Sequence, residues 1–393
     1  MASRPTLADV DFDQAPFVVI WETTQACDLA CLHCRACAVP TRDPRELDTA
    51  EAKTLIDTIR RFGRPLLVLT GGDPLKRPDA VELVRYGVDA GLRVALTPSG
   101  TPLMTPQVLA ELHEAGMSRL AVSLDGATAE QHDAFRGVTG SWEWTIRMLE
   151  AARALGLSTQ INTTISRHNL HQLEPLIALM TRLGIALWSV FFIVPVGRAR
   201  PEDLTTAEEF ESVFERLYEL SGTAPFDIKT TAAPHYRRLV MQRQRAERRG
   251  GSRSEPPVPF TGGIGFSLPD GVGRAAKGVN DGDGFVFVSH RGDIYPSGFL
   301  PLSAGNVRTD DLVDVYRSHE LFRSLRDRDR LKGKCGVCEF RSVCGGSRAR
   351  AYAMTGDPLE ADPLCAYVPH RWGRDDGGRR PNFLPLATGS RAS

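Results

Sequence analysis

"CDLACLHCRAC", residues 27–37, places four of the eight cysteines of the chain within eleven positions. These are Cys27, Cys31, Cys34 and Cys37. A zinc finger or ribbon pairs two short cysteine knuckles over a longer span, so four ligands in this stretch would be cramped for tetrahedral zinc. Three thiolates from one loop instead suit three corners of a four-iron cubane and leave one iron open for chemistry. The spacing therefore favours a reactive iron–sulfur site.

The segments on both sides of this stretch alternate between strand and helix patterns. "FVVIWET" (17–23) is a buried strand, and Asp48 and Glu51 form a capping-box pattern for the next helix. The later strands are expected in "PLLVLTGG" (65–72), "RVALTPSG" (93–100), "SRLAVSLDG" (118–126), "STQINTTIS" (158–166) and "ALWSVFFIV" (186–194). Six β–α units predict an α/β fold with a parallel sheet, whose chemistry lies at the carboxyl ends of the strands.

The composition indicates a globular protein without a dominant charge. Apolar residues make up 42% of the 393 residues, and 48 basic residues balance 48 acidic ones. A balanced charge gives no electrostatic argument for nucleic acid or an acidic membrane. The N-terminal stretch has no apolar run typical of a signal peptide, and no segment is long enough to span a membrane. We expect a cytoplasmic protein whose cysteines bind metal or act in redox chemistry.

A second group of cysteines follows near the C-terminus as Cys335-x2-Cys338-x5-Cys344-x20-Cys365. Four thiolates can complete either a zinc site or an iron–sulfur cluster, and the spacing alone leaves both open. The sequence divides into a core at 15–200, connecting helices and a Gly/Pro-rich loop at 201–283, a cysteine-containing domain at 284–370 and a flexible tail at 371–393.

The first cysteine motif, with His33 before Cys34, resembles the cluster motif of the radical S-adenosylmethionine superfamily. The similarity extends over residues 17–200 and implies a partial (β/α)6 barrel. "TGGDP" (70–74) resembles the segment that binds the methionine amino group, which implies roles for Gly71, Gly72 and Asp73, although Glu is usual at the last position. "SLDG" resembles the ribose-contacting segment, with Ser123 and Asp125. Arg136 is similar to an arginine that meets the methionine carboxylate, and Asn162 is a further candidate.

The resemblance also implies the chemistry. Three cysteines bind a 4Fe-4S cluster, and the fourth iron is chelated by S-adenosylmethionine. One electron cleaves this cosubstrate, and the resulting 5′-deoxyadenosyl radical abstracts a hydrogen from the substrate. If Cys37 were bound to the fourth iron, the cosubstrate would have no place there, so we expect Cys37 to be a plain thiol. An external donor such as flavodoxin or ferredoxin would supply the electron.

The C-terminal part resembles the SPASM/twitch extension of radical enzymes. A full extension carries two auxiliary clusters, but the hairpin "FVFVSHRGDIYPSGF" has Ser289 and Ser297 where cysteines would be sought. We therefore expect one auxiliary 4Fe-4S cluster, bound by Cys335, Cys338, Cys344 and Cys365. "LKGKCGVCEFRSVCGGSRARAYAMTGDPLEADPLCAY" (331–367), which contains Ser347, is similar to the subgroup that alters propionate side chains of tetrapyrroles in haem biosynthesis.

A tetrapyrrole would require cations for its carboxylates and a ligand for its iron. Two other classes stay open: a radical enzyme that matures a ribosomal peptide or a small metabolite, and a non-enzymatic iron–sulfur or zinc protein. The polar residues at the strand ends suit a cosubstrate pocket, which a non-enzymatic protein would not need, so they argue against the third class. The candidate substrate residues are Arg198, Lys229, Arg237 and Arg238 for carboxylates and His235 for iron.

Overall fold

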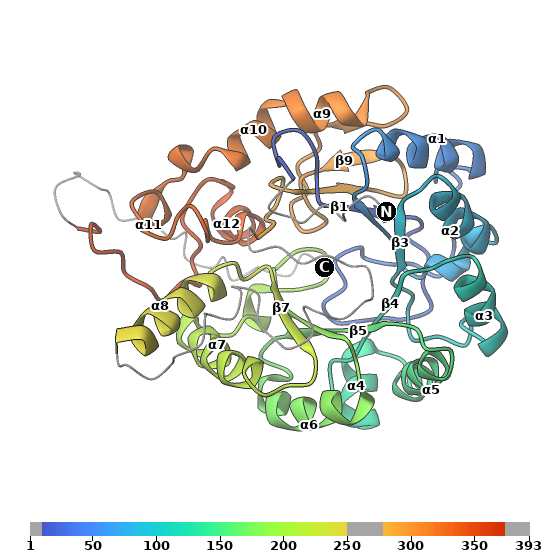
Figure 1. Cartoon of the computed structure of the whole chain (residues 1–393), viewed down its shortest axis with the longest axis horizontal. Coiled ribbons are helices and arrows are strands. Elements are labelled where there is room, and N and C mark those ends of the chain that lie inside the picture. Colours follow the sequence, from blue (N-terminus) through green and yellow to red (C-terminus); the bar gives the residue numbers. More distant parts are fainter. Residues whose placement is uncertain (1–9, 250–277, 374–393) are drawn as a thin grey trace, which may run out of the picture.

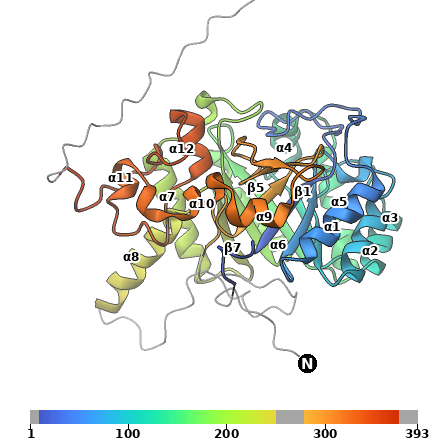
Figure 2. The same ribbon diagram turned by 90° about the horizontal axis from the view of Figure 1, so that it is seen from above.

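The structure, a computed structural model, describes residues 10–249 and 278–373. One curved sheet of ten strands forms its centre, with helices along the outer side of the sheet (Figures 1 and 2). The strands are β1 (Val18–Glu22), β2 (Leu66–Thr70), β3 (Arg93–Leu96), β4 (Arg119–Ser123), β5 (Thr159–Ile165), β6 (Leu187–Phe192), β7 (Asp227–Thr231), β8 (Phe285–Val288), β9 (Asp293–Tyr295) and β10 (Gly305–Asn306).

Each strand from β1 to β7 is followed in the chain by at least one helix, as the β–α alternation predicts. The helices are α1 (Thr49–Arg60), α2 (Ala80–Asp89), α3 (Pro106–Glu114), α4 (Ala129–Arg136), α5 (Ser141–Ala154), α6 (Leu173–Leu183), α7 (Ala207–Ser221), α8 (Tyr236–Arg249), α9 (Leu312–Ser318), α10 (Glu320–Arg326), α11 (Gly333–Gly336) and α12 (Arg348–Thr355). The predicted capping box of α1 is present, with the Asp48 side chain accepting from the Glu51 peptide nitrogen.

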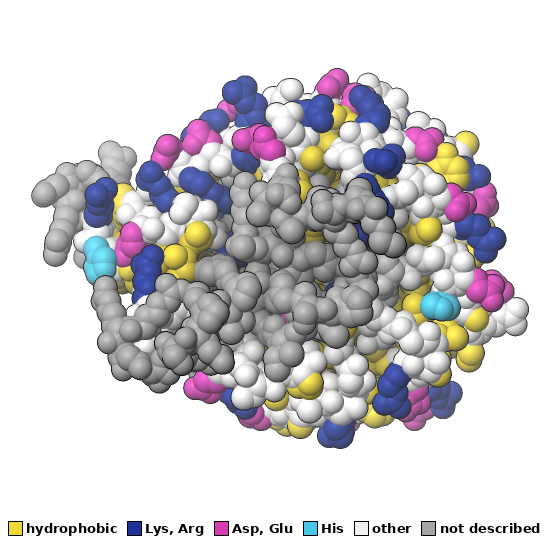
Figure 3. Space-filling view, in the orientation of Figure 1, with side chains coloured by type: hydrophobic (Ala, Val, Ile, Leu, Met, Phe, Trp, Pro, Cys, Tyr) yellow, Lys and Arg dark blue, Asp and Glu magenta, His cyan; other side chains and the backbone are white. Residues whose placement is uncertain are grey.

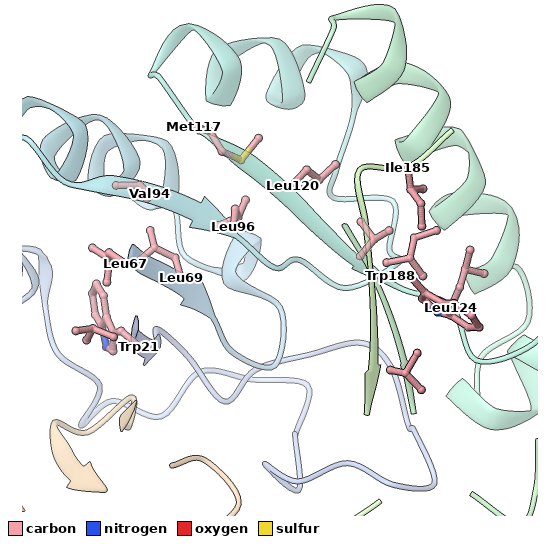
Figure 4. Close-up of a cluster of buried hydrophobic side chains, with 14 of the residues drawn as sticks. Trp21, Leu67, Leu69, Val94, Leu96, Met117, Leu120, Leu124, Ile185 and Trp188 are labelled. Carbon is pink, nitrogen blue, oxygen red and sulfur yellow. The ribbon is translucent and has the colours of Figure 1, made fainter. Parts of the chain in front are cut away.

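Strand residues alternate between a helix-facing side and a side that faces the interior of the curved sheet. The helix-facing side chains form the main core, in which Trp21, Leu67, Leu96 and Trp188 are buried (Figure 4). The inward residues are more polar at the carboxyl ends, where Glu22, Thr70 and Ser123 end β1, β2 and β4. A parallel sheet thus combines an apolar outer layer with a polar end suited to a site.

The order of the strands extends the predicted barrel. β1 to β7 are consecutive and parallel, and β8 pairs with β1 in parallel on the opposite side. The six-stranded expectation therefore missed β7, whose inward residues Asp227, Lys229 and Thr231 are all polar and weaken the apolar signal of a strand. The predicted hairpin is present as β8 and β9, but it continues the barrel sheet. Figure 1 shows α9 of the C-terminal part beside α1.

Some predicted features lie outside the described residues. These are most of the Gly/Pro-rich loop after α8 and the tail beyond residue 373. Within the part of the chain that is described, no helix is both long and apolar enough to cross a membrane. On the face seen in Figure 3, acidic and basic side chains are interspersed around the rim, in keeping with the balanced charge.

Candidate functional site

The first three cysteines gather at the carboxyl end of β1. Cys27 and Cys31 are buried, and Cys34 packs against the same small apolar cluster. Cys37 is exposed, and its backbone has a left-handed φ of 48°, whereas the next residue, Ala38, packs in the cluster again. The loop therefore presents three thiols together and sets the fourth apart.

Neighbouring strand ends press closely on this cysteine loop. A Cβ at Gly72 would lie 2.3 Å from the Ala26 carbonyl oxygen, so only glycine lets the end of β2 approach. On the other side, Arg198 donates from Nε to the Cys31 carbonyl (2.9 Å) and from Nη1 to the Ala38 carbonyl (3.3 Å). Its backbone nitrogen also donates to the Cys34 carbonyl, at 3.0 Å. The sequence predicted Arg198 as a substrate residue, but the structure shows that it holds the cysteine loop.

A buried ion-pair group fixes the middle of the loop. Glu22 at the end of β1 pairs with Arg35, and its other oxygen lies 2.7 Å from His290 Nδ1. Burial alone would raise the pKa of Glu22, but the charge and hydrogen bonds of Arg35 and His290 lower it to about 2. Glu22 is therefore ionised at neutral pH, and it ties the cysteine loop to the turn after β8.

A pocket of about 460 Å³, partly open to solvent, lies beside the cysteine loop. Its walls are the carboxyl ends of β2, β3 and β4 together with α4 and α5. Gly71, Gly72, Ser123 and Arg136, all predicted from the sequence, line it. The lining also includes Leu29, Thr70, Thr97, Pro98, Ser99, Gly100, His132 and Thr145.

Two of the pocket residues connect it with the cysteines. The Ser99 hydroxyl donates to the Gly72 carbonyl (2.8 Å) and lies 3.2 Å from Cys27 Sγ. Arg136 is 3.6 Å from Cys31 Sγ and forms an ion pair with Asp125. Its buried Nε has no hydrogen-bond partner among the described residues, which leaves one donor for a bound anionic group. Ser99 and Arg136 therefore connect the pocket with two of the three cysteines.

Two carboxylates predicted to touch the cosubstrate are in fact enclosed. Asp73 is 0% exposed and accepts from the Thr101 hydroxyl (2.7 Å) and the Leu75 peptide nitrogen (3.1 Å), and its burial raises its pKa. Asp125, also 0% exposed, pairs with Arg136 and accepts from Thr164. Neither carboxylate lines the pocket, because both are used to hold the strand-end turns. The direct contacts with the cosubstrate that the sequence predicts for them stay predictions.

Two further residues named from the sequence lie near the pocket without lining it. His33 stacks on Phe135 with ring centroids 4.4 Å apart, and burial keeps its pKa well below the usual value. Asn162, on the inward side of β5, accepts from the Gln160 amide at 2.7 Å. His33 therefore packs the loop against α4, and the Asn162 amide oxygen is already used by a neighbour on the same strand.

The other four cysteines line a second, partly open pocket between α8, α11 and the loop after α12. Cys335 and Cys344 are buried, and Cys338 and Cys365 are half-buried. Burial raises the pKa of Cys365 to about 12 and that of Cys344 further. Thiolates at these positions consequently require compensating positive charge, which a bound metal centre provides.

The walls of this second pocket carry donors directed at sulfur. The peptide nitrogens of Phe340 and Gly346 lie 3.4 Å from the Sγ atoms of Cys338 and Cys344, respectively. The buried Arg348 guanidinium lies 3.8 Å from Cys335 Sγ. A Cβ at Gly346, where φ is +67°, would lie 3.1 Å from Cys335 Sγ and closer still to Arg348. Such donors stabilise negatively charged sulfur.

Across residues 10–249 and 278–373, no three His, Cys, Asp or Glu side chains converge closely enough to hold one metal ion. In a four-iron cluster each thiolate binds a different iron, so the ligands surround the cluster. The first cysteine site offers three thiols for such a cluster, and the second offers four.

The remaining substrate candidates are divided between two places. His235 is 0% exposed and lines the second cysteine pocket, so it has no open face for a substrate iron. Arg237 donates to the Val343 and Val279 carbonyls (3.1 and 2.8 Å), and Arg238 pairs with Glu211. Only Lys229 presents an exposed side chain, on the inward side of β7. Lys229 therefore differs from the other three in the exposure of its side chain, although Arg237 is near enough for its charge to lower the pKa of Lys229.

Sequence reasoning missed several residues that shape the site. Ser99 was visible only as part of a polar strand end, "TPSG". Arg35 and Glu22 carry no motif signal, because their pairing depends on how the cysteine loop folds back on β1. His132, which is buried and accepts from the Asp125 peptide nitrogen at 3.2 Å, lies on α4, a helix that was not predicted.

Comparison with known proteins agrees with this geometry. A sequence model of the radical SAM superfamily matches residues 21–180. The AdoMet-dependent heme synthase of Methanosarcina barkeri (strain Fusaro / DSM 804) is 43% identical over 356 residues, which cover 90% of this chain and 97% of that protein. Mycofactocin maturase MftC of Mycobacterium tuberculosis (strain ATCC 25618 / H37Rv) is 33% identical over 361 residues, covering 89% of this chain and 83% of the relative.

Solved structures show the same fold at lower identity. The crystal structure of Streptococcus suis SuiB bound to S-adenosylmethionine has a TM-score of 0.66 at 17% identity, and covers 90% of this chain and 78% of the other. The fold and the three-cysteine loop together define an enzyme that works with an iron–sulfur cluster. The chain belongs to the radical SAM superfamily. When a four-iron cluster and S-adenosylmethionine are bound, they supply the one-electron chemistry that removes hydrogen from an unreactive carbon.

Proposed function

We propose that this radical SAM enzyme modifies the propionate side chains of an iron tetrapyrrole in haem biosynthesis. The observation that carries the proposal is the 43% identity with an AdoMet-dependent heme synthase over nearly the whole of both chains. The maturase relative covers a similar share of this chain at 33%. Since both relatives cover a similar share of this chain, the higher identity favours a tetrapyrrole substrate.

In this proposal, Cys27, Cys31 and Cys34 bind the catalytic cluster, while Gly71, Gly72, Ser123 and Arg136 surround S-adenosylmethionine. Cys335, Cys338, Cys344 and Cys365 bind the auxiliary cluster. Gly71, Gly72, Ser123 and Arg136 line the pocket beside the cysteine loop, which supports their assignment. The N–H donors directed at the sulfurs of the C-terminal cysteines support the auxiliary cluster. Residues 15–200, 201–283 and 284–370 are proposed as core, connection and auxiliary region, although β7 to β10, which lie in the second and third of these ranges, continue the sheet of the core.

Lys229 is the proposed anchor for a substrate carboxylate. Its partner in the sheet register is Ser189, which pairs in turn with Asn162, and Asn162 pairs with Ser123. This row across four strands places Lys229 at the same height in the barrel as a residue of the S-adenosylmethionine pocket. Desolvation by the surrounding protein, together with the charges of Arg237 and Arg119, lowers the pKa of Lys229 to about 8, while part of the side chain remains accessible to solvent.

The direct test is anaerobic incubation of the reduced enzyme with S-adenosylmethionine and iron porphyrins that carry propionates. Mass spectrometry should show the loss of carbon dioxide and two hydrogens for each propionate converted to vinyl. The electron for S-adenosylmethionine cleavage is proposed to come from a cytoplasmic donor such as flavodoxin or ferredoxin. A porphyrin that neither binds nor changes mass would contradict the tetrapyrrole assignment.

Peptide maturation is the second candidate, and the 33% identical mycofactocin maturase is the observation that favours it. The same incubation should then include short peptides encoded near the gene. A mass change in such a peptide, together with an inert porphyrin, would replace the first proposal. A change in the porphyrin alone would exclude the peptide role.

A further inference from the structure

His235 occupies an unusual position for a histidine. Its ring is 0% exposed and stacks on Phe210, with centroids 5.8 Å apart and an interplanar angle of 16°. The edge of Phe214 closes the site, at a centroid distance of 4.8 Å. Nevertheless, neither ring nitrogen has a hydrogen-bond partner among the described residues. A buried polar side chain without a partner is rare, because no hydrogen bond offsets the free-energy cost of removing it from water.

The nearest carboxylate, Asp362, does not supply the missing hydrogen bond. Asp362 Oδ2 lies 3.9 Å from His235 Nδ1, beyond hydrogen-bond distance. That carboxylate already accepts from Arg350 (3.0 Å) and from the Ser347 peptide nitrogen (2.9 Å). His235 therefore keeps at least one nitrogen directed elsewhere, and the space that it lines is the pocket of the four auxiliary cysteines.

The other hydrogen-bond donors around that pocket are directed at sulfur. Phe340, Gly346 and Arg348 each direct an N–H group at a cysteine sulfur. We propose that His235 donates a hydrogen bond to a sulfur of the auxiliary cluster and thereby raises the reduction potential of that cluster. A donor stabilises the reduced cluster more than the oxidised one, because reduction adds negative charge that is shared by the sulfurs. His235 is thus a positioning and tuning residue, not a ligand of the substrate.

This inference rests on the auxiliary cluster of the proposed function and is independent of its substrate. The test uses the full chain with Cys27, Cys31 and Cys34 changed to Ala, so that the auxiliary cluster is the only iron–sulfur centre. His235→Phe keeps an aromatic ring between Phe210 and Phe214 but removes both nitrogens. His235→Gln keeps an N–H donor. Tyr367→Phe is the control, because it removes a hydroxyl in the same wall that donates to Glu339 instead.

Each variant is reduced stepwise under anaerobic conditions while the paramagnetic signal of the reduced cluster is recorded. His235→Phe should make reduction less favourable by about tenfold, which is a shift of about 59 mV to lower potential for one electron. His235→Gln should restore part of this difference, and Tyr367→Phe should leave the potential unchanged. Iron is measured in every sample.

The possible results separate the explanations. A full iron complement with an unchanged potential in His235→Phe would overturn the proposal. Loss of iron in both His235 variants would also overturn it, because His235 would then be needed to build the site. Iron loss in His235→Phe alone, with a near-normal potential in His235→Gln, would support it. Zinc in place of iron would reject both this inference and the auxiliary cluster, whereas an inert porphyrin would reject only the proposed substrate.

Discussion

At the scale of single residues, two cysteines that are close in the sequence, Cys34 and Cys37, have different surroundings. Cys34 packs in the cluster of the first two cysteines, whereas Cys37 is exposed on a left-handed turn. Cys37→Ser should therefore leave about eight irons per chain, the sum of two four-iron clusters, and Cys34→Ser should leave about four. Iron and sulfide analysis after anaerobic reconstitution checks both. Equal losses in the two variants would mean that four cysteines bind the first cluster.

Lys229 gives a prediction about pH. With a pKa of about 8, its ammonium is charged below pH 8 and attracts a substrate carboxylate, and it loses this attraction as the pH rises further. A charge-assisted hydrogen bond contributes about 1.5–3 kcal/mol, so Lys229→Met should weaken iron-porphyrin binding by about tenfold or more at pH 7. Absorption titrations at pH 7 and 9 should show a decline for the natural enzyme that Lys229→Met lacks.

Lys229→Arg is the matched variant, because arginine stays charged throughout this range. It should bind with little change between pH 7 and 9. Identical pH profiles for the natural enzyme, Lys229→Met and Lys229→Arg would show that Lys229 does not contact a carboxylate.

At the scale of elements, the ends of β1 and β2 meet through a glycine. Gly72→Ala would place a methyl group 2.3 Å from the Ala26 carbonyl, so the cysteine loop and the cosubstrate pocket must move apart. Overpacking of this kind costs about 1–3 kcal/mol, and binding of S-adenosylmethionine should weaken as well. Gly222→Ala is the control, since its Cβ would meet only the Glu219 carbonyl, at 3.5 Å. Thermal unfolding and calorimetric binding measure both effects, and parallel behaviour of the two variants would refute the close-contact argument.

The elements also show which parts of the molecule a sequence can predict. The six apolar strands and the capping box of α1 were found because apolar periodicity and capping are local. β7 was missed because its inward side is polar. The two groups of cysteines were visible from their spacing, and the structure brings the second group together around one pocket. The complete burial of Asp73 and His235 could not be predicted, because burial and side-chain direction depend on tertiary packing, which no local pattern records.

At the scale of the whole molecule, one buried arginine joins the barrel to the auxiliary site. Arg350 donates to the carbonyls of Phe192 and Ala232, at the ends of β6 and β7, and pairs with Asp362 on the loop that leads to Cys365. Arg350→Lys would lose most of these bonds. Breaking a buried pair costs about 3–5 kcal/mol, so we expect a lower unfolding temperature and loss of the auxiliary irons.

Arg341→Lys provides the comparison for this effect. Arg341 forms an exposed ion pair with Asp329 near the same cysteines, and an exposed pair contributes about 0–1 kcal/mol. Stability and iron content should both be preserved. If Arg350→Lys also preserved them, the barrel and the auxiliary site would be energetically independent.

The pairing of β8 with β1 has a consequence for synthesis on the ribosome. β1 is made first, and its partner on one side follows only at Phe285, 267 residues after Val18. At about 5–20 residues per second, the edge of β1 stays unpaired for roughly 13–53 s. Exposed strand edges invite pairing with other chains, so the nascent protein is open to aggregation throughout this interval. The same delay keeps the Glu22–His290 contact beneath the cysteine loop from forming, so the first cysteine site reaches its final shape only after residue 290 of the 393 has been made.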